Sequence, residues 1–340
     1  MKVAYILYQR GVISGKSNGI RSQALTWQKL LLAHSIDCIL INNWEYYNWE
    51  EFDAIHIFGY DIAIGAFIDT LSKKNSNIFI SPIIDSQKSY FKYRLATLNG
   101  FNKLRLYSSN YSLRKALKNV KGVCARSDHE MGYFLESFSI PKIKVFNIPL
   151  SYDVVEPSDI TDIILSKDNF CLHISSIYQE RKNVIRLIKA AKKFKFKLVL
   201  AGSTGSLKDL ERINAVINGD QNIKVLGFIS EEQKLALYRK AKVFALPSTN
   251  EGVGIVAVDA SVYGCNIAIT NLKGPQEYYP NISNVKIVNP YDIDDIGEKI
   301  IDLMNTENNL ELFLHMKNNF SKDMLFLKLI NMYSNKNGCT

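Results

Sequence analysis

The chain has 340 residues, of which 47% are hydrophobic and 22% charged, a composition typical of a globular protein of about two domains. No uncharged apolar stretch approaches the roughly 20 residues that span a bilayer, and residues 1–10 lack the apolar core of a signal peptide. These features argue against a disordered chain and against an integral membrane protein. We therefore expect a cytoplasmic protein.

Five cysteines are scattered along the chain without a CxxC pair or a Cys/His cluster. Four of them, Cys38, Cys124, Cys171 and Cys265, lie in or beside apolar runs. We expect reduced core residues rather than disulfides or zinc ligands, and no metal site is predicted.

The net charge of +9 is concentrated in the first half of the chain. Residues 1–153 hold 19 Lys and Arg against 12 Asp and Glu, and residues 88–126 hold ten basic residues and no acidic one. Tyrosines and phenylalanines are interleaved with these charges. Such a stretch favours an anionic partner, for which we expect the inner face of a membrane. A solvated basic face and a nucleic-acid-binding surface are the alternatives.

Short apolar runs alternate with helical stretches through the first half of the chain. This alternation predicts βαβ units and a parallel sheet. The expected strands are 3–8, 38–41, 54–58, 78–83, 123–125 and 144–148. The expected helices are 19–33 and 128–138, the second with Asp128 as a suitable N-cap.

A polar, broken segment over 149–167 predicts a domain boundary, and the pattern restarts after it. The expected strands are then 170–174, 197–201, 223–227, 243–246, 266–270 and 285–288. The expected helices are 183–193, 207–218, 231–240, 254–263, 292–305, 308–320 and 322–333. The fold class is therefore α/β, with two Rossmann-like, doubly wound domains that face each other across a cleft. The first domain is 1–152 and the second is 153–321, and the C-terminal segment, about 322–340, is expected to pack back on the first.

The most informative stretch follows the apolar strand at 243–246 and opens a helix. Gly252 and Gly254 let the backbone approach a ligand, and the free N–H groups of a helix start attract an anion. Glu251 stands at the loop tip and Asp259 eight positions later, so the two carboxylates could reach opposite ends of an elongated ligand. A tight turn with an acid that suits the helix dipole is the alternative.

Two further loops follow predicted strands. Arg181 and Lys182 are adjacent cations that could neutralise a diphosphate leaving group without a metal, although a solvated charged turn is the alternative. The glycine loop at 13–20 contains Gly-Lys-Ser but lacks the spacing of a nucleoside-triphosphate loop. All three loops lie at carboxyl ends of strands, where open α/β sheets bind ligands, and this joint placement favours a ligand site.

These motifs resemble those of the retaining nucleotide-sugar glycosyltransferases of family 4, which have the GT-B fold. The resemblance is densest over 170–280. It involves the family's Glu-Gly-Phe-Gly…Glu motif, its Arg-Lys phosphate turn, its base-binding strand and helix, and the segment downstream. The matching stretches here are Glu251-Gly252-Val253-Gly254 with Asp259, Arg181-Lys182-Asn183, 225–238 and 264–277.

The resemblance implies roles for these residues. Lys182, with Arg181, would neutralise the donor diphosphate, and Glu251 would hold hydroxyls of the transferred sugar. Asp259 would bind the ribose. The donor-binding residues that it implies are Gly19, Ser176, Gly227, Phe228, Gly252, Val253, Gly254 and Asp259.

The chain departs from the family's pattern at three positions. Asp259 is shorter than the usual Glu, and Ser176 stands where many members carry Arg. Ile84 stands where many members have His, so Asp85 is our substitute candidate on the acceptor side. His56, on an apolar strand, is interpreted first as a core residue and second as an acceptor-side candidate.

The function implied is that of a retaining, hexosyltransferase-like enzyme in polysaccharide biosynthesis. It would move a sugar from a nucleoside-diphosphate sugar to a glycan or lipid-linked acceptor, without a metal or other cofactor. A GT-B epimerase or phosphorylase, a non-catalytic sugar-nucleotide-binding protein and a nucleic-acid-binding protein are the alternatives. No nucleic-acid partner is expected, because Glu251 and Asp259 would then have no role.

Overall fold

A computed structural model describes residues 1–8, 19–101 and 106–334 of the chain. The contacts divide the chain into two compact units. Unit 1 comprises Met1–Leu150 and Lys322–Thr340, and unit 2 comprises Ser151–Ser321. The division therefore falls two residues before the position expected from the sequence, and the C-terminal segment belongs to unit 1.

Unit 1 is built on a six-stranded parallel sheet with the order β2-β1-β3-β4-β7-β8. Its strands are β1 (Lys2–Leu7), β2 (Asp37–Leu40), β3 (Ala54–Phe58), β4 (Ile78–Ser81), β7 (Gly122–Ala125) and β8 (Val145–Asn147). Nearly every residue of the four central strands is buried. This continuous apolar pattern is typical of a parallel sheet covered on both faces.

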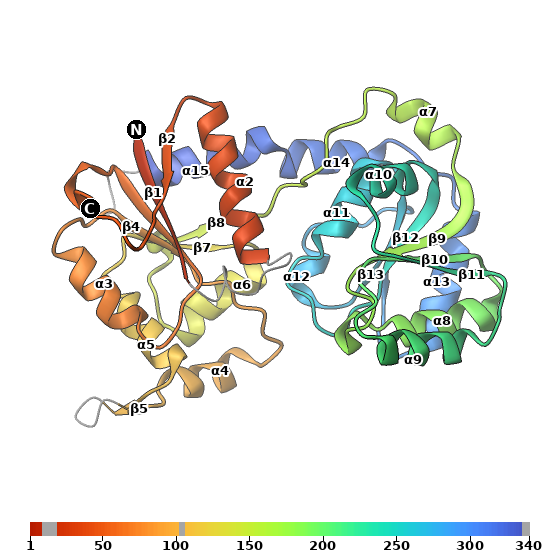
Figure 1. The fold of residues 1–340 in the computed structure, drawn as a ribbon, viewed down its shortest axis with the longest axis horizontal. Coiled ribbons are helices and arrows are strands. Elements are labelled where there is room, and N and C mark those ends of the chain that lie inside the picture. The colour runs from red at the N-terminus through yellow and green to blue at the C-terminus, as the bar shows by residue number, and fades with distance from the viewer. Residues whose placement is uncertain (9–18, 102–105, 335–340) are drawn as a thin grey trace. The chain divides into compact units, whose positions relative to one another are not determined.

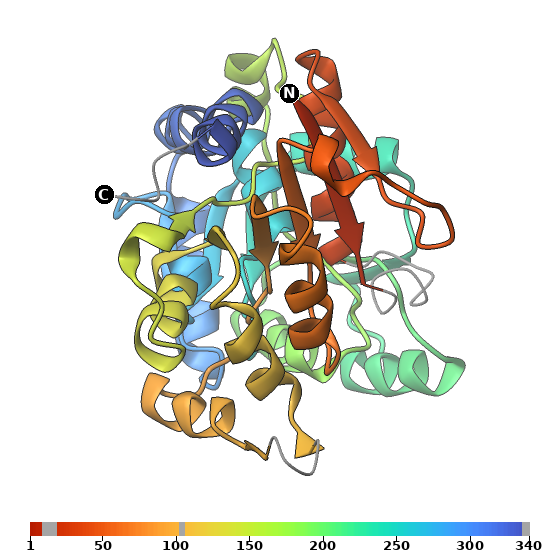
Figure 2. The same ribbon diagram turned by 90° about the vertical axis from the view of Figure 1, so that its left-hand side faces the viewer.

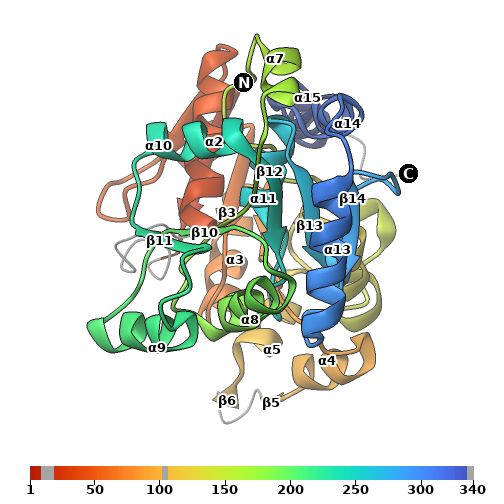
Figure 3. The same ribbon diagram turned by 90° about the vertical axis from the view of Figure 1, so that its right-hand side faces the viewer.

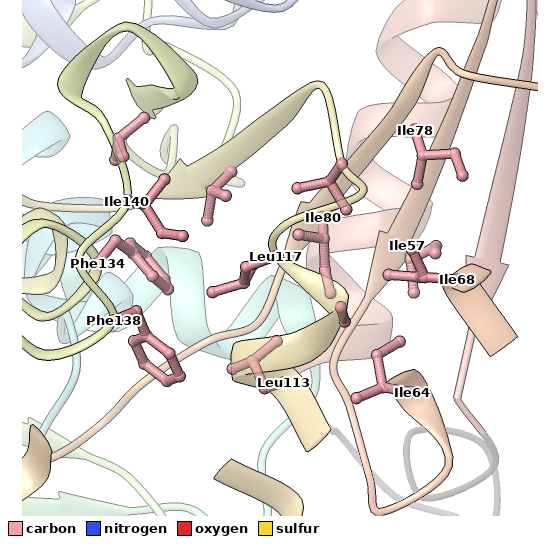
Figure 4. Packing of buried hydrophobic residues seen from close by; sticks show 14 of the residues in the cluster. Ile57, Ile64, Ile68, Ile78, Ile80, Leu113, Leu117, Phe134, Phe138 and Ile140 are labelled. Atoms are coloured by element: carbon pink, nitrogen blue, oxygen red, sulfur yellow. The ribbon is translucent and has the colours of Figure 1, made fainter. Parts of the chain in front are cut away.

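Helices cover both faces of this sheet (Figures 1 and 2). On one face, α2 (Gly19–Ala33) and α15 (Lys322–Ser334) contribute to one apolar cluster. On the other face, a second cluster includes α3 (Ile64–Ser72) and α5 (Ser109–Ala116), followed by residues 117–140 (Figure 4). The remaining elements of unit 1 are 3-10 helices at Trp49–Glu51 and Lys142–Lys144, α4 (Tyr90–Thr97), the hairpin β5–β6 (Gly100–Phe101 and Leu106–Tyr107), α6 (Asp128–Gly132) and η2 (Tyr133–Ser137).

The structure corrects three expectations in unit 1. The predicted helix 128–138 is a short α-helix followed by a π-helical turn, η2. The strand predicted for 78–83 stops at Ser81, because Pro82 has no N–H and Ile83 has a left-handed φ of 64°. The helices α3, α4 and α5 are absent from the sequence-based prediction.

Unit 2 carries a second six-stranded parallel sheet, with the order β11-β10-β9-β12-β13-β14. Its strands are β9 (Asp168–Ile174), β10 (Leu198–Ala201), β11 (Ile223–Gly227), β12 (Ala241–Leu246), β13 (Asn266–Thr270) and β14 (Val285–Val288). Its helices are α7 (Ile160–Leu165), the 3-10 helix η4 (Glu180–Lys182), α8 (Val184–Phe194), α9 (Leu207–Ile217), α10 (Glu231–Lys240), α11 (Ile255–Val262), α12 (Lys273–Gln276), α13 (Ile293–Asn305) and α14 (Glu311–Phe320). The segment read as a broken linker thus contains a helix, α7.

The helices of unit 2 are divided between the two faces of the sheet. The cluster on one face includes α8, α9 and α13, and Figure 3 shows α8 and α13 side by side there. On the other face, Tyr238 of α10 contacts Phe244 of β12, and α11 packs on β12 and β13. The sheet is therefore doubly wound, with the reversal of strand order between β9 and β12. Open α/β sheets bind ligands at the carboxyl ends of the strands at such a switch point.

Candidate active site

The switch point of unit 2 holds a buried ion pair between Lys182 and Glu251. Lys182 ends η4, which follows β9, and Glu251 lies in the loop after β12. Lys182 Nζ donates to Glu251 Oε2 at 2.5 Å, and each side chain is only 11% exposed. Ser248 Oγ donates to the same oxygen at 3.3 Å. Adjacent parallel strands thus bring together two charges that lie 69 positions apart in the sequence.

The side chain of Asn183 holds the turn between η4 and α8, next to Lys182, against neighbouring segments. Its backbone has a left-handed φ of 61° between η4 and α8, a conformation that Asn tolerates better than most residues. Its Nδ2 donates to the carbonyl oxygens of Pro247 at 2.8 Å and Pro290 at 2.6 Å, and Arg186 donates to its Oδ1 at 2.9 Å. The side chain therefore fixes the turn that presents Lys182.

Glycines shape the backbone on both sides of this pair. Gly254 has φ 80°, and a Cβ there would lie 2.7 Å from Leu246 Cδ2, so the loop enters α11 along a path that only glycine fits well. At Gly202, after β10, a Cβ would lie 1.9 Å from the carbonyl oxygen of Ser175. Gly254 is the N-cap of α11, whose first amides have no intrahelical acceptors and favour an anion.

Arg181 and Ser176 lie near the same edge with different exposures. Arg181 is exposed, and its guanidinium donates to Gln179 Oε1 at 2.9 Å and to the carbonyl of Asn250 at 3.4 Å. Its own carbonyl accepts the N–H of Thr249 at 2.8 Å, which ties the two loops together. Ser176 is half-buried in the turn after β9. Arg181 is thus oriented by both loops, and among the described residues it forms no salt bridge with a carboxylate.

Asp259 is a buried carboxylate inside α11. It is 2% exposed, and its Oδ1 accepts the backbone N–H of Asp153 at 2.9 Å. Burial raises the pKa of Asp259 to about 6, although that hydrogen bond and the charge of Lys234 oppose the shift. One carboxylate oxygen is therefore already engaged within the unit.

The remaining glycine and aromatic candidates lie in the loop after β12 or at the end of β11. Gly252 and Val253 are in the loop that ends at Gly254, where Val253 is buried. Gly227 ends β11, and the next residue, Phe228, is exposed. Phe228 lines a cavity of about 340 Å³ against α10, together with Leu226, Ile229 and Leu237.

In unit 1, Asp85 belongs to a charged network at the carboxyl ends of β4 and β7. Its Oδ1 accepts from Arg126 Nη2 at 2.7 Å, and Arg126 Nε donates to Glu130 Oε2 at 2.8 Å. Glu130 also accepts the backbone N–H of Ile84 at 2.5 Å. Burial alone would lower the pKa of Arg126, but the charges and hydrogen bonds of the two carboxylates raise it above its usual value. Arg126 and Glu130 are nearly buried, while the side chain of Asp85 is 47% exposed.

His56 lies in the core of unit 1. It is fully buried, with Nδ1 2.7 Å from Tyr333 Oη and Nε2 2.8 Å from Ser81 Oγ. Burial lowers the pKa of His56 to about 3, so the ring is neutral at physiological pH. Both nitrogens are thus committed to the packing of α15 against β3 and β4, and we do not include His56 in the acceptor site.

Gly19 is the first residue of α2, and a Cβ there would meet no atom within 4 Å. The rest of the predicted glycine loop, residues 13–18, lies outside the described residues. Within the described ranges, no group of three or more His, Cys, Asp or Glu side chains could hold a metal ion. In the same ranges, no helix combines the length and apolar character that a membrane crossing needs. The four cysteines expected in the core are buried and free.

Sequence reasoning missed several residues that support these sites. His173, near the end of β9, lies 2.8 Å from the carbonyl of Ala245 through Nδ1 and 2.7 Å from Ser175 Oγ through Nε2. Burial lowers the pKa of His173 to about 4. A histidine in an apolar strand beside a binding loop was the available signal. Ser248, which contacts Glu251 three positions later in the same loop, gave no signal of this role.

Residues 160–322 match the family model described as "Glycosyl transferases group 1". Among curated relatives, the capsular polysaccharide biosynthesis glycosyltransferase CapM of Staphylococcus aureus is 25% identical over 181 residues, which are 50% of this chain and 47% of that protein. The chain thus spans about half the length of the curated relatives that it matches. This similarity relates unit 2 to glycosyltransferases.

Solved structures match over nearly the whole chain. Sucrose-phosphate synthase from Thermosynechococcus elongatus superposes with a TM-score of 0.74 at 15% identity, over 98% of each chain. Anabaena HepE in complex with UDP and glucose superposes with a TM-score of 0.69 at 16% identity, over 98% of this chain and 99% of that one. The α/β architecture with two six-stranded parallel sheets is therefore that of GT-B proteins, which confirms the predicted fold class.

Proposed function

We propose that the chain transfers a sugar from a nucleoside-diphosphate sugar to a glycan or lipid-linked acceptor, with retention of anomeric configuration and without a metal. The observation that carries the proposal is the buried Lys182–Glu251 pair at the switch point of a Rossmann-like sheet. Nucleotides bind at such switch points, and a lysine beside a helix start suits a diphosphate. The capsular relative CapM supports a role in polysaccharide synthesis, and HepE, which was solved with UDP and glucose, supports a nucleoside-diphosphate donor.

The two residues of the ion pair have different roles at the donor. An ammonium group has three N–H donors, and Glu251 takes one from Lys182, which leaves two for the diphosphate oxygens. Both hydrogen bonds to Glu251 in the described part of the chain reach Oε2, so Oε1 can accept a sugar hydroxyl. Lys182 would thus hold the diphosphate while Glu251 orients the transferred sugar.

In the proposed reaction, the bond from the anomeric carbon to the diphosphate oxygen breaks, and a bond to the acceptor oxygen forms on the same face. The proton of the acceptor hydroxyl passes to the departing phosphate oxygen. Lys182, Arg181 and the amides at the start of α11 stabilise the charge that develops on the leaving group. Positioned charges in a buried site perform this role without a metal ion.

On the acceptor side, we assign Asp85 as the residue that binds the acceptor hydroxyl. Arg126 pairs with the carboxylate of Asp85 and is itself held by Glu130, so the carboxylate is oriented. The side chain of Asp85 is half-exposed and therefore accessible to an acceptor. Ile83, two positions before Asp85, has a left-handed backbone, which is rare for a β-branched residue and typical of functional sites. Asp85→Ala should raise the KM for acceptor while the affinity for donor is unchanged. Equal effects on donor and acceptor would refute the assignment.

We also propose that α4 and the β5–β6 hairpin contact an anionic membrane surface. Their exposed apolar side chains are Phe91, Leu95, Leu98, Phe101 and Leu106, and residues 88–126 carry no acidic residue. Apolar side chains among cations bind the interface of anionic membranes. The wild type should sediment with anionic vesicles at low salt, and Phe91→Gln with Leu95→Gln should reduce this. Absence of sedimentation would refute the membrane role.

The donor site is tested by thermal shift with UDP, GDP, ADP and CMP, each with and without EDTA. We expect one nucleoside diphosphate to stabilise the wild type regardless of EDTA, and Lys182→Ala to abolish this stabilisation. The matched control is Lys193→Ala, at the other end of α8, where the lysine forms an equally short pair with Asp294 at the surface. Loss of stabilisation in both variants, or in neither, would contradict the role of Lys182.

The stereochemistry is tested separately, on the product. Once the donor is known, NMR of the product gives its anomeric configuration. Retention is expected, because Glu251 is assigned to hydroxyl binding rather than to activation of an acceptor on the opposite face. An inverted product would refute the retaining assignment and leave the donor site intact.

A further inference from the structure

Unit 1 contains a cavity of about 390 Å³ that is lined by none of the residues assigned to the donor or to the acceptor. Arg114, Leu117 and Lys118 line it from the segment before β7, and residues 138–141 and Lys144 line it from the segment before β8. Since these residues precede parallel strands, the cavity lies at the amino ends of β7 and β8. Asp85 and Arg126 follow strands and lie at the opposite edge.

Three cations line this cavity. Arg114 Nη1 donates to the carbonyl of Phe138 at 3.4 Å, and Lys144 Nζ donates to the carbonyl of Val120 at 3.2 Å. Lys118 is exposed at the rim. Throughout the described ranges, none of the three has a carboxylate within salt-bridge distance. Burial and the charge of Arg94 lower the pKa of Arg114, so the positive charge here is not compensated.

The floor of the cavity is apolar and buried. Leu117, Phe138 and Ile140 line it and are also buried members of the core cluster shown in Figure 4. An apolar floor cannot solvate the cations above it, so an anion that enters gains strong charge-assisted hydrogen bonds. The volume is within the range of small-molecule sites and exceeds the needs of a bare phosphate.

We propose that this cavity binds a phosphate group carried by a small molecule or by a lipid headgroup. Arg114, Lys118 and Lys144 supply N–H donors to the phosphate, and arginine suits its geometry through paired N–H groups. The apolar floor contacts the remainder of the ligand. The site is separate from the donor-binding residues of unit 2 and is independent of the sugar transfer proposed above.

The first test is calorimetric titration with inorganic pyrophosphate. It is done in a Lys182→Ala background, so that the proposed donor site does not contribute. Binding is expected in this background and should weaken about tenfold in Lys118→Gln and in Arg114→Gln. Lys142→Gln, an exposed lysine outside the cavity, is the matched control and should bind like its parent. Lys118 is exposed, so this variant keeps the test valid if Arg114→Gln does not fold.

The second test separates free phosphate from a lipid source. The same variants are sedimented with phosphatidylcholine vesicles with and without phosphatidylglycerol. If Lys118→Gln weakens pyrophosphate binding, the ligand is a soluble phosphate compound. If pyrophosphate does not bind but Lys118→Gln weakens binding to the vesicles, the ligand is a lipid headgroup. If neither assay distinguishes Lys118→Gln and Arg114→Gln from Lys142→Gln, the proposal is wrong.

Discussion

Asp259 is a buried carboxylate whose charge should reduce the stability of unit 2. Burial raises its pKa to about 6 in the folded protein, against about 3.9 in an unfolded chain. Asn has nearly the same shape, and its side-chain oxygen can still accept the N–H of Asp153. The substitution Asp259→Asn therefore removes the charge and preserves the hydrogen bond.

The direction of the effect follows from proton binding. Between about pH 4 and pH 6 the folded state holds more protons at Asp259 than the unfolded state, so the stability of the wild type falls as the pH rises through this window. A difference of about 2 pKa units corresponds to about 3 kcal/mol. At pH 7 we therefore expect Asp259→Asn to be more stable than the wild type by up to about 3 kcal/mol. For a unit of this size, that is about 6–12 °C in Tm.

The assay is urea and thermal unfolding of the wild type and the variant at several pH values from 4 to 7. The gain in stability should be largest at pH 7 and small at pH 4. Asp302→Asn is the control, because Asp302 is 56% exposed and pairs with Lys286 at the surface. It should change stability by less than about 1 kcal/mol at any pH. The reasoning is refuted if Asp259→Asn is less stable than the wild type at pH 7. It is also refuted if the variant exceeds the wild type in stability by the same amount at pH 4 and at pH 7.

Three further predictions concern the framework of the sites. Asn183→Ala removes two buried hydrogen bonds and leaves Ala at φ 61°. It should lower the free energy of unfolding in urea by about 2–4 kcal/mol. An unchanged urea midpoint would contradict the role of Asn183 in fixing the turn beside Lys182. Gly254→Ala would place Cβ 2.7 Å from Leu246 Cδ2 at φ 80°; it should cost about 1–3 kcal/mol and weaken stabilisation by the nucleoside diphosphate in thermal shift. Tyr333→Phe removes the hydroxyl 2.7 Å from His56 Nδ1 and should cost about 1–3 kcal/mol in unfolding, with no change in donor affinity. A loss of donor affinity in that variant would show that α15 influences unit 2.

Hydrophobic patterning in the sequence was sufficient to predict most strands of the two sheets. The predicted bounds of β3, β11, β13 and β14 agree with the structure, as do those of α2 and α10. These strands are apolar runs bounded by turn residues, and burial in a parallel sheet maintains that pattern in the sequence. The helices α3, α4 and α5 were missed. Helix α4 is largely exposed, with cations and apolar side chains interleaved, and it is held by contacts with η2 rather than by a strong apolar face of its own.

The sequence by itself determined which residue types could serve the chemistry at the proposed donor site. The local motifs around Lys182, Glu251 and Gly254 identify these residues as candidates. What only the tertiary structure decided is which of these residues meet. Lys182 contacts Glu251 because β9 pairs directly with β12, and Arg126 reaches Asp85 because β7 pairs with β4. Strand order depends on long-range packing between segments that local patterns do not encode. For the same reason, the cavity lined by Arg114, Lys118 and Lys144 exists only in the folded chain.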